Sequence, residues 1–215
     1  MEGHPYSPKD LHLPEFTPNL LPGTTIFGIF VVASVIVFSI SWILSGLLSK
    51  STKVERLLIC WFTFNGLLYM TVELYLPLRP HFYKDKTGFY LDEIWKEFSK
   101  GDSRYAIMDS NVVALQGVTV FIAAPACLSA TYAIATHKSY RYVLQLAISL
   151  WQCYGFTIYY LTAFLEGNHF SASPYYYYAY FIGVKLPWIL IPFLIIKRCW
   201  RKICEYESKN KTKFQ

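Results

Sequence analysis

The chain has 215 residues, of which 54% are hydrophobic, 19% aromatic and only 16% charged. The aromatic share is well above that of ordinary soluble proteins, and the charged residues lie between long uncharged stretches, which argues against a soluble domain. The formal net charge of +6 comes largely from a basic C-terminal tail rather than from an aromatic-interleaved patch, so nucleic acid is not an expected partner.

Five stretches are long and apolar enough to cross a lipid bilayer, which takes roughly 20 residues. In chain order the helices are expected at about 24–49, 57–78, 110–136, 142–165 and 175–196. A buried soluble core explains one or two such stretches, but not five in a chain of this length. The sequence therefore predicts an all-α, polytopic membrane protein, built as a bundle of five transmembrane helices.

The segments outside these helices predict an orientation. Residues 197–215 are rich in Lys and Arg, which indicates a cytosolic tail. With five spans, residues 1–23 are then lumenal, and they lack the short apolar region of a cleavable signal peptide. The connector 79–109 fits this scheme badly, because it would be lumenal and yet contains six Lys or Arg residues.

The chain ends in KTKFQ, with lysines third and fifth from the end, which resembles a dilysine retrieval signal of the endoplasmic reticulum. A solvated basic end near anionic lipid explains the same residues. The cysteines show no CxxC spacing and are expected to be small buried hydrophobes rather than disulfides or metal ligands.

Polar residues form stripes on the apolar helices. Asn65, Tyr69 and Glu73 are spaced i, i+4, i+8 on the second helix, and Lys185 lies on the fifth helix with Phe181 and Trp188 on the same face. An ionisable residue within a span costs roughly 2.5–3.5 kcal/mol and is a functional candidate by default. The sequence contains two, of opposite sign.

The third helix offers Gln116 followed one turn later by Thr119, and the fourth offers Gln145, Ser149 and Gln152. If these stripes converge, they form one polar pocket with aromatic walls. Such a pocket suits an apolar polycyclic ligand that arrives from the bilayer. Three alternatives remain: the amides only join helices, the two ionisable residues form a structural ion pair, or the carboxylate snorkels to the interface. No cofactor-binding motif is present, so neither a cofactor nor a metal is expected.

Three long motifs identify a family resemblance. The stretches EIWKEFSKGDSRY (residues 93–105), CWFTFNG (60–66) and YVLQLAISLWQCYG (142–155) closely resemble the sterol Δ8–Δ7 isomerases, also known as emopamil-binding proteins, and in particular their plant members. The resemblance covers nearly the whole chain. It implies a polytopic protein of the endoplasmic reticulum that moves a ring double bond by acid/base chemistry through a carbocation.

The chain departs from the family pattern in its predicted pocket. The family has a histidine where this sequence has Tyr69, a glutamate where it has Gln116, and an asparagine where it has Lys185, whereas Glu73 and Trp188 are kept. Tyrosine has a reference pKa of about 10 and is a poor proton carrier near neutral pH. The ordinary double-bond shift should suffer from these changes.

The departures favour a repurposed isomerase that resembles the melianol oxide isomerases of limonoid biosynthesis. The resemblance implies opening of an epoxide on a tetracyclic triterpenoid, followed by a methyl shift or cyclopropane formation. Two alternatives stay open: a Δ8–Δ7 sterol isomerase with a rewired pocket, and a non-catalytic binder of sterols or amphiphiles. The expected catalytic residues are Glu73, Tyr69 and Lys185, and the expected substrate-binding residues are Gln116, Trp188, Asn65, Phe181 and Gln152. The expected partners are the polycyclic substrate and the lipid bilayer, and a homodimer is an open alternative to a monomer.

Overall fold

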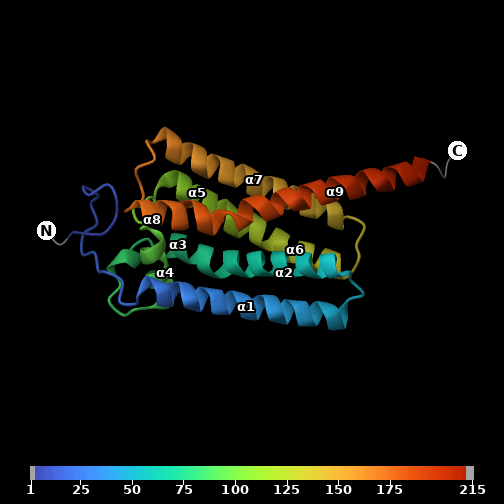
Figure 1. The fold of residues 1–215 in the computed structure, drawn as a ribbon, viewed down its shortest axis with the longest axis horizontal. Helices are drawn as coiled ribbons and strands as arrows, with labels where there is room; N and C mark the ends of the chain where they lie inside the picture. The colour runs from blue at the N-terminus through green and yellow to red at the C-terminus, as the bar shows by residue number, and fades with distance from the viewer. Residues whose placement is uncertain (1–2, 212–215) are drawn as a thin grey trace.

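The computed structural model describes residues 3–211, with side chains as far as residue 205. Long helices run side by side in one bundle, and the two ends of the chain lie at opposite ends of it (Figure 1). The secondary structure of the described residues is helical, which confirms the all-α prediction. The KTKFQ sequence falls on residues 211–215, whose side chains lie outside the described part.

Within the described residues, four helical stretches are long and apolar enough to span a membrane, so the chain is a multi-pass membrane protein. They are α1 (Gly23–Leu48), the composite helices Lys53–Leu78 and Ser110–Ala135, and the last stretch, Pro174–Glu205. The predicted fourth helix is present as α7 (Arg141–Leu165), with 25 residues. It is not apolar enough to count as a candidate span, because polar residues such as Gln145 and Gln152, which are both buried, lower its mean hydropathy.

Three of these stretches contain short segments of other helical types. The second is α2 (Lys53–Leu68), a π-helical turn (Tyr69–Glu73) and α3 (Leu74–Leu78). The third is α5 (Ser110–Val118), a π-helical turn (Thr119–Ala123) and α6 (Ala124–Ala135). The last is α8 (Pro174–Tyr176), a π-helical segment (Tyr177–Ile182), a 3₁₀ turn (Gly183–Lys185) and α9 (Pro187–Lys211).

The second helix begins at Lys53 rather than at the predicted residue 57, and a cap explains the difference. The Thr52 hydroxyl accepts the backbone N–H of Glu55 at 3.3 Å, and Glu55 Oε2 accepts the backbone N–H of Thr52 at 3.0 Å. This capping box satisfies two free donors at the helix start. Arg141 lies 3.5 Å from the Glu55 carboxylate, so the charged first turn is also paired.

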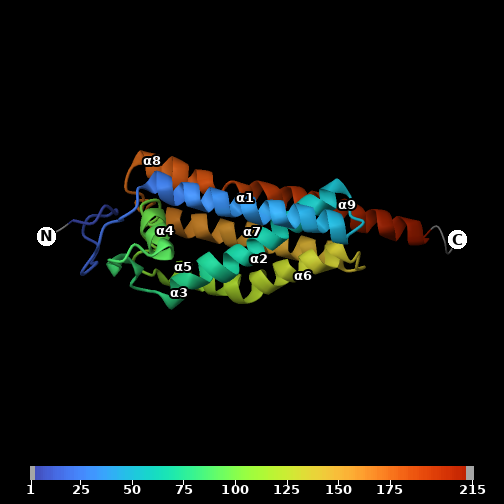
Figure 2. The same cartoon turned by 90° about the horizontal axis from the view of Figure 1, so that it is seen from below.

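The bundle is built from neighbouring helix pairs: α2 packs against α1 and α6, and α7 packs against α9 (Figures 1 and 2). The outer face of α1 remains uncovered by protein. Its apolar side chains there, such as Val32 and Val35, are more than half exposed. In a membrane-spanning helix such a face is covered by lipid tails.

One end of the bundle is closed by the N-terminal residues 3–22 and the connector 79–109, which together form what we call the connector cap (Figure 1). The cap contains a 3₁₀ turn (Phe82–Lys84) and α4 (Tyr90–Phe98). Glu93 Oε2 accepts the backbone N–H groups of Leu20 and Leu21 at 2.7 and 3.0 Å. The Tyr6 hydroxyl donates to the Lys96 carbonyl at 3.1 Å. These bonds join the two segments.

The connector's basic residues, which fitted the orientation prediction badly, are paired inside the cap. Lys96 and Arg104 are fully buried and lie 3.1 and 2.9 Å from Glu93 and Asp102. Three further pairs lie at 3.7, 2.6 and 3.7 Å: Arg79–Asp92, Lys100–Glu97 and Lys84–Glu15. Five of the six basic residues in the connector therefore have an acidic partner within the folded cap, which sequence counting does not reveal.

Candidate functional site

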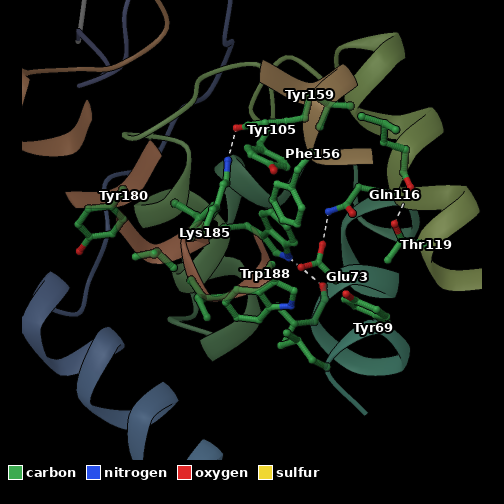
Figure 3. A pocket seen from close by; sticks show the side chains of 18 of the residues that line it. Tyr69, Glu73, Tyr105, Gln116, Thr119, Phe156, Tyr159, Tyr180, Lys185 and Trp188 are labelled. Carbon is green, nitrogen blue, oxygen red and sulfur yellow. Dashed lines mark hydrogen bonds between the residues drawn. The ribbon is translucent and has the colours of Figure 1, made fainter. Parts of the chain in front are cut away.

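A cavity lies inside the bundle next to the connector cap, with about 1300 Å³ of empty space including its opening. Side chains from α1, the two composite helices, α4, α7 and the last stretch form its wall, and most of them are apolar or aromatic (Figure 3). Six of the eight predicted site residues line this cavity: Tyr69, Glu73, Gln116, Gln152, Lys185 and Trp188. The predicted polar stripes therefore converge.

Asn65 and Phe181 correct the prediction, because neither lines the cavity. Asn65 is fully buried one helical turn before Tyr69, and Phe181 is 4% exposed. Both lie behind residues that do face the cavity. The even i, i+4, i+7 spacing assumed for Phe181, Lys185 and Trp188 fails because the chain passes through a π-helical segment and a 3₁₀ turn there.

The irregular helical segments share a cause that is readable in the sequence. Pro77, Pro125 and Pro187 each follow such a segment. A proline has no N–H to donate to the carbonyl four residues earlier and clashes with it, so the helix must deform over the preceding turn. Single π-turns within α-helices occur frequently at functional sites. Here Glu73 and Lys185 are the last residues of two of these segments.

Glu73 points into the cavity and is engaged by Gln116, whose Nε2 donates to its carboxylate (Figure 3). Glu73 is half-buried and Gln116 is 8% exposed. The side chain is therefore held within the bundle rather than extended toward the helix end, which answers the alternative that it snorkels. The bond uses an amide where the family resemblance implies a second carboxylate.

Lys185 is held by aromatic rings. Its Nζ donates to the hydroxyl of Tyr159 and lies 3.6 Å from the centre of that ring. Tyr105, Phe181 and Phe98 place their ring centres 5.4, 5.2 and 5.5 Å from the same nitrogen. Cation–π attraction stabilises an ammonium group in such surroundings. Phe181 thus contributes to the site by holding Lys185.

Lys185 is linked through Tyr159 to Asp102 and does not pair directly with Glu73. Tyr159 donates its hydroxyl to Asp102, and Arg104 binds both oxygens of that carboxylate with contacts of 2.9 to 3.2 Å. A line of contacts therefore runs from the cavity into the connector cap. Glu73 and Lys185 belong to separate networks, so the predicted alternative of a structural ion pair is not what the geometry contains.

The remaining predicted residues form a third network. Trp188 Nε1 donates to Asn65 Oδ1 at 2.7 Å, which fixes the indole ring at the cavity wall. Gln152 Nε2 donates to the Tyr69 hydroxyl at 2.9 Å. Because that oxygen accepts, the Tyr69 proton is not used in this bond. Gln145 lies seven residues before Gln152 on α7, where its amide donates to the Arg141 carbonyl at 2.8 Å and accepts the Cys199 thiol of α9 at 3.9 Å.

Sequence reasoning missed the groups that hold Lys185. Asp102 and Arg104 lie in the GDSRY part of a motif that marked the family resemblance but had no assigned place in the pocket. Tyr159 is one of many tyrosines on an apolar helix, and nothing in its spacing singles it out. An Asp and an Arg two residues apart before an apolar stretch were the available signal.

Comparisons with known proteins identify the family of this chain. The family model described as EXPERA (EXPanded EBP superfamily) matches residues 90–199. A probable 3-beta-hydroxysteroid-Delta(8),Delta(7)-isomerase of Arabidopsis thaliana is 48% identical over 98% of both chains. A protoglabretal synthase of Ailanthus altissima is 48% identical over the full length of both. An isomeliandiol synthase of Melia azedarach is 44% identical over 81% of this chain and 84% of its own.

The match to the family model covers half of the chain, and the similarity to the relatives extends over nearly all of it. The relatives are named for sterol isomerisation and for triterpenoid synthesis, and both kinds are similar to this chain along the same length. The chain belongs to the EBP family and is a membrane isomerase of that family.

Proposed function

We propose that this chain isomerises an epoxidised tetracyclic triterpenoid by opening the epoxide, rearranging the skeleton and losing a proton. The observation that carries the proposal is the separation of Lys185 and Glu73 into two networks on one largely apolar cavity. A proton donor and a proton acceptor can then serve different atoms of one rigid polycycle. Similarity does not choose the substrate, since the Arabidopsis and Ailanthus relatives are equally identical to this chain.

The first step needs an acid at the epoxide oxygen. The Lys185 ammonium donates a proton to that oxygen, one C–O bond breaks, and the oxygen becomes a hydroxyl while the carbon becomes a cation. Tyr69 is a second candidate donor, since its proton is not used in the bond from Gln152. An epoxide oxygen is more basic than an alkene carbon, so a weaker acid suffices for opening it than for the family's double-bond shift.

The second step needs a cation that is stabilised until a methyl group has migrated, and a base that removes a proton only after that migration. The Trp188 indole, fixed by Asn65, offers an aromatic face to the cation. A neighbouring methyl group migrates with its bonding electrons, and the charge moves to the carbon that it leaves. Glu73 then takes a proton from carbon, and the electrons of that C–H bond form an alkene or close a cyclopropane. Return of this proton to Lys185 completes an isomerisation with no net gain or loss of atoms.

An ammonium group near a carbocation raises an objection, because like charges repel. The transfer of the proton answers it, because Lys185 becomes a neutral amine that stays bound to the Tyr159 hydroxyl. The positive charge passes from Lys185 to the substrate in this step, so the ammonium group and the carbocation do not exist together. The repulsion therefore falls in the step that creates the cation.

The second candidate is a Δ8–Δ7 sterol isomerase, favoured by the 48% identity with the Arabidopsis relative. It would require protonation of a ring alkene where Gln116, bound to Glu73, stands in place of the second carboxylate that the family resemblance implies. The test is expression in yeast that lacks its own Δ8–Δ7 isomerase, with Δ8-sterol and epoxidised triterpenoid supplied separately. We expect isobaric products from the epoxide and no rescue of sterol synthesis. Rescue without turnover of the epoxide would decide for the sterol isomerase.

The location and membrane arrangement are also proposals. We infer that α7 is a fifth span, since it runs the length of the bundle against α9 and the chain ends lie at opposite ends. With an odd number of spans and a basic tail, the C-terminus is cytosolic and the connector cap lumenal. The endoplasmic reticulum is supported by the family resemblance.

A further inference from the structure

A second polar cluster reaches the cavity apart from the groups around Glu73 and Lys185. Its centre is Glu97 on α4, which is 4% exposed and lines the cavity together with Tyr180. Glu97 Oε1 accepts the hydroxyls of Tyr176 and Tyr180 at 3.1 and 3.2 Å, and Lys100 Nζ lies 2.6 Å from Oε2. A buried carboxylate on an otherwise apolar wall calls for a reason.

The position of this cluster along the bundle is defined by two neighbours. Gly23 is the first residue of α1, and a Cβ built on it would lie 2.5 Å from Glu97 Oε1. Tyr176 belongs to the first turn of the last span. The Glu97 carboxylate therefore lies where two spans begin, at the level of the membrane interface, a region in which tyrosines are enriched.

The reacting residues are attached further along their spans, and the Lys185 side chain reaches back until its Nζ is 5.5 Å from the ring centre of Phe98, the residue after Glu97. Tyr180 precedes Lys185 in the same span by five residues, which corresponds to about 7 Å along the helix axis at a rise of about 1.5 Å per residue. That separation is comparable with the reach from a hydroxyl on a terminal ring to the next rings of a fused tetracycle. A polycyclic alcohol in a bilayer keeps its hydroxyl near the interface, because an unpaired polar group is costly in hydrocarbon.

The cluster also has capacity to bind such a hydroxyl. A carboxylate offers about four acceptor positions, and three donors reach Glu97. The Tyr180 oxygen adds a further acceptor at the cavity wall. We propose that Glu97, together with Tyr180, is the subsite that binds a hydroxyl on the terminal ring of a polycyclic alcohol and thereby sets its depth relative to Lys185 and Glu73.

This inference rests on the proposed function only in taking a polycyclic alcohol as the ligand. The competing explanation is that Glu97 only joins the connector cap to the last span. Binding of two radiolabelled probes distinguishes them: a Δ8-sterol with a 3-hydroxyl group and its 3-deoxy counterpart. The full chain in lipid nanodiscs is compared with its Glu97→Gln and Tyr180→Phe variants. Glu15→Gln is the control, since that carboxylate is 73% exposed and does not line the cavity.

We expect the parent to prefer the alcohol, and Glu97→Gln to weaken alcohol binding about tenfold or more, as for the loss of a hydrogen bond to a charged group. Tyr180→Phe, which keeps the ring, should weaken it less, and neither variant should change binding of the deoxy probe. Equal losses for both probes, or no preference in the parent, would overturn the subsite. Failure of the parent to bind either probe would also overturn the subsite, whereas the proposed function is decided separately by turnover of the triterpenoid epoxide. Selective binding without epoxide turnover would overturn the proposed function alone.

Discussion

At the scale of single residues, Glu73 carries the clearest expectation. Glu73→Gln keeps the size of the side chain and a hydrogen-bonding partner for Gln116, but it removes the base. We expect product formation from the triterpenoid epoxide to fall by about 100-fold or more, as for loss of a general base, while sterol binding persists. Product analysis by mass spectrometry and a parallel binding assay measure the two effects. Normal turnover by the variant would remove Glu73 from the mechanism.

Variants of Lys185 and Tyr159 distinguish the proton donor from the residue that holds it in place. Lys185→Met removes the proton donor but leaves Asp102 paired with Arg104, so the protein should still fold. Turnover is expected to fall about 100-fold. Tyr159→Phe keeps the ammonium group and loses the link to Asp102, and we expect a smaller loss, in kcat rather than in KM. If Lys185→Met turned over the epoxide at the parent rate, Tyr69 would be the remaining donor among those proposed.

At the scale of elements, the connector cap should depend on its buried ion pair. Arg104 is fully buried and binds Asp102 through two nitrogens, so Asp102→Asn leaves a buried guanidinium without its counter-charge. Removing one partner of a buried pair costs about 3–5 kcal/mol. The expected result is a large drop in the thermal unfolding temperature in detergent. Asp10→Asn, at an exposed position, is the control. Equal melting of both variants would contradict the role of this pair.

The positions of the long helices could largely be predicted from the sequence. Apolar length alone located the first four long helices to within a few residues, because crossing a bilayer requires it. It misplaced the start of α2, since the Thr52–Glu55 cap extends the helix into charged sequence. The last predicted helix was also too short, because nothing in the basic tail ends α9 before Lys211.

The site was predicted where a polar residue interrupts an apolar helix, and missed where the partner lies in a loop or among many similar residues. Glu73, Lys185 and Gln116 stand out because the residues on either side of them in the sequence are mostly apolar. Asp102 and Glu97 are not, because charged residues are ordinary in a connector and only folding buries them. Phe181 was misjudged because the helical repeat is broken by the π-helical segment before Pro187. Prolines inside predicted spans therefore mark places where an even helical spacing should not be assumed.

At the scale of the whole molecule, the number of membrane crossings is open to a direct test. The two ends of the chain lie at opposite ends of the bundle, and α7 runs between the loops 136–140 and 166–173 (Figure 1). If α7 crosses the membrane, these two loops face opposite compartments, and so do the two termini. If α7 lay on one side only, four spans would leave both termini in the same compartment.

Acceptor sites for N-glycosylation, which is confined to the lumen, distinguish these arrangements. One Asn-x-Thr site on a flexible linker is introduced at a time, at the N-terminus, in residues 166–173, in residues 136–140 and at the C-terminus. We expect modification at the first two positions and none at the last two, read as a mass shift that a glycosidase reverses. The N-terminal segment and the connector are joined in the connector cap. The same pattern would therefore place the Glu97 cluster near the lumenal interface. Modification at both termini would contradict the fifth span but keep the cap lumenal, whereas modification at neither terminus would contradict both.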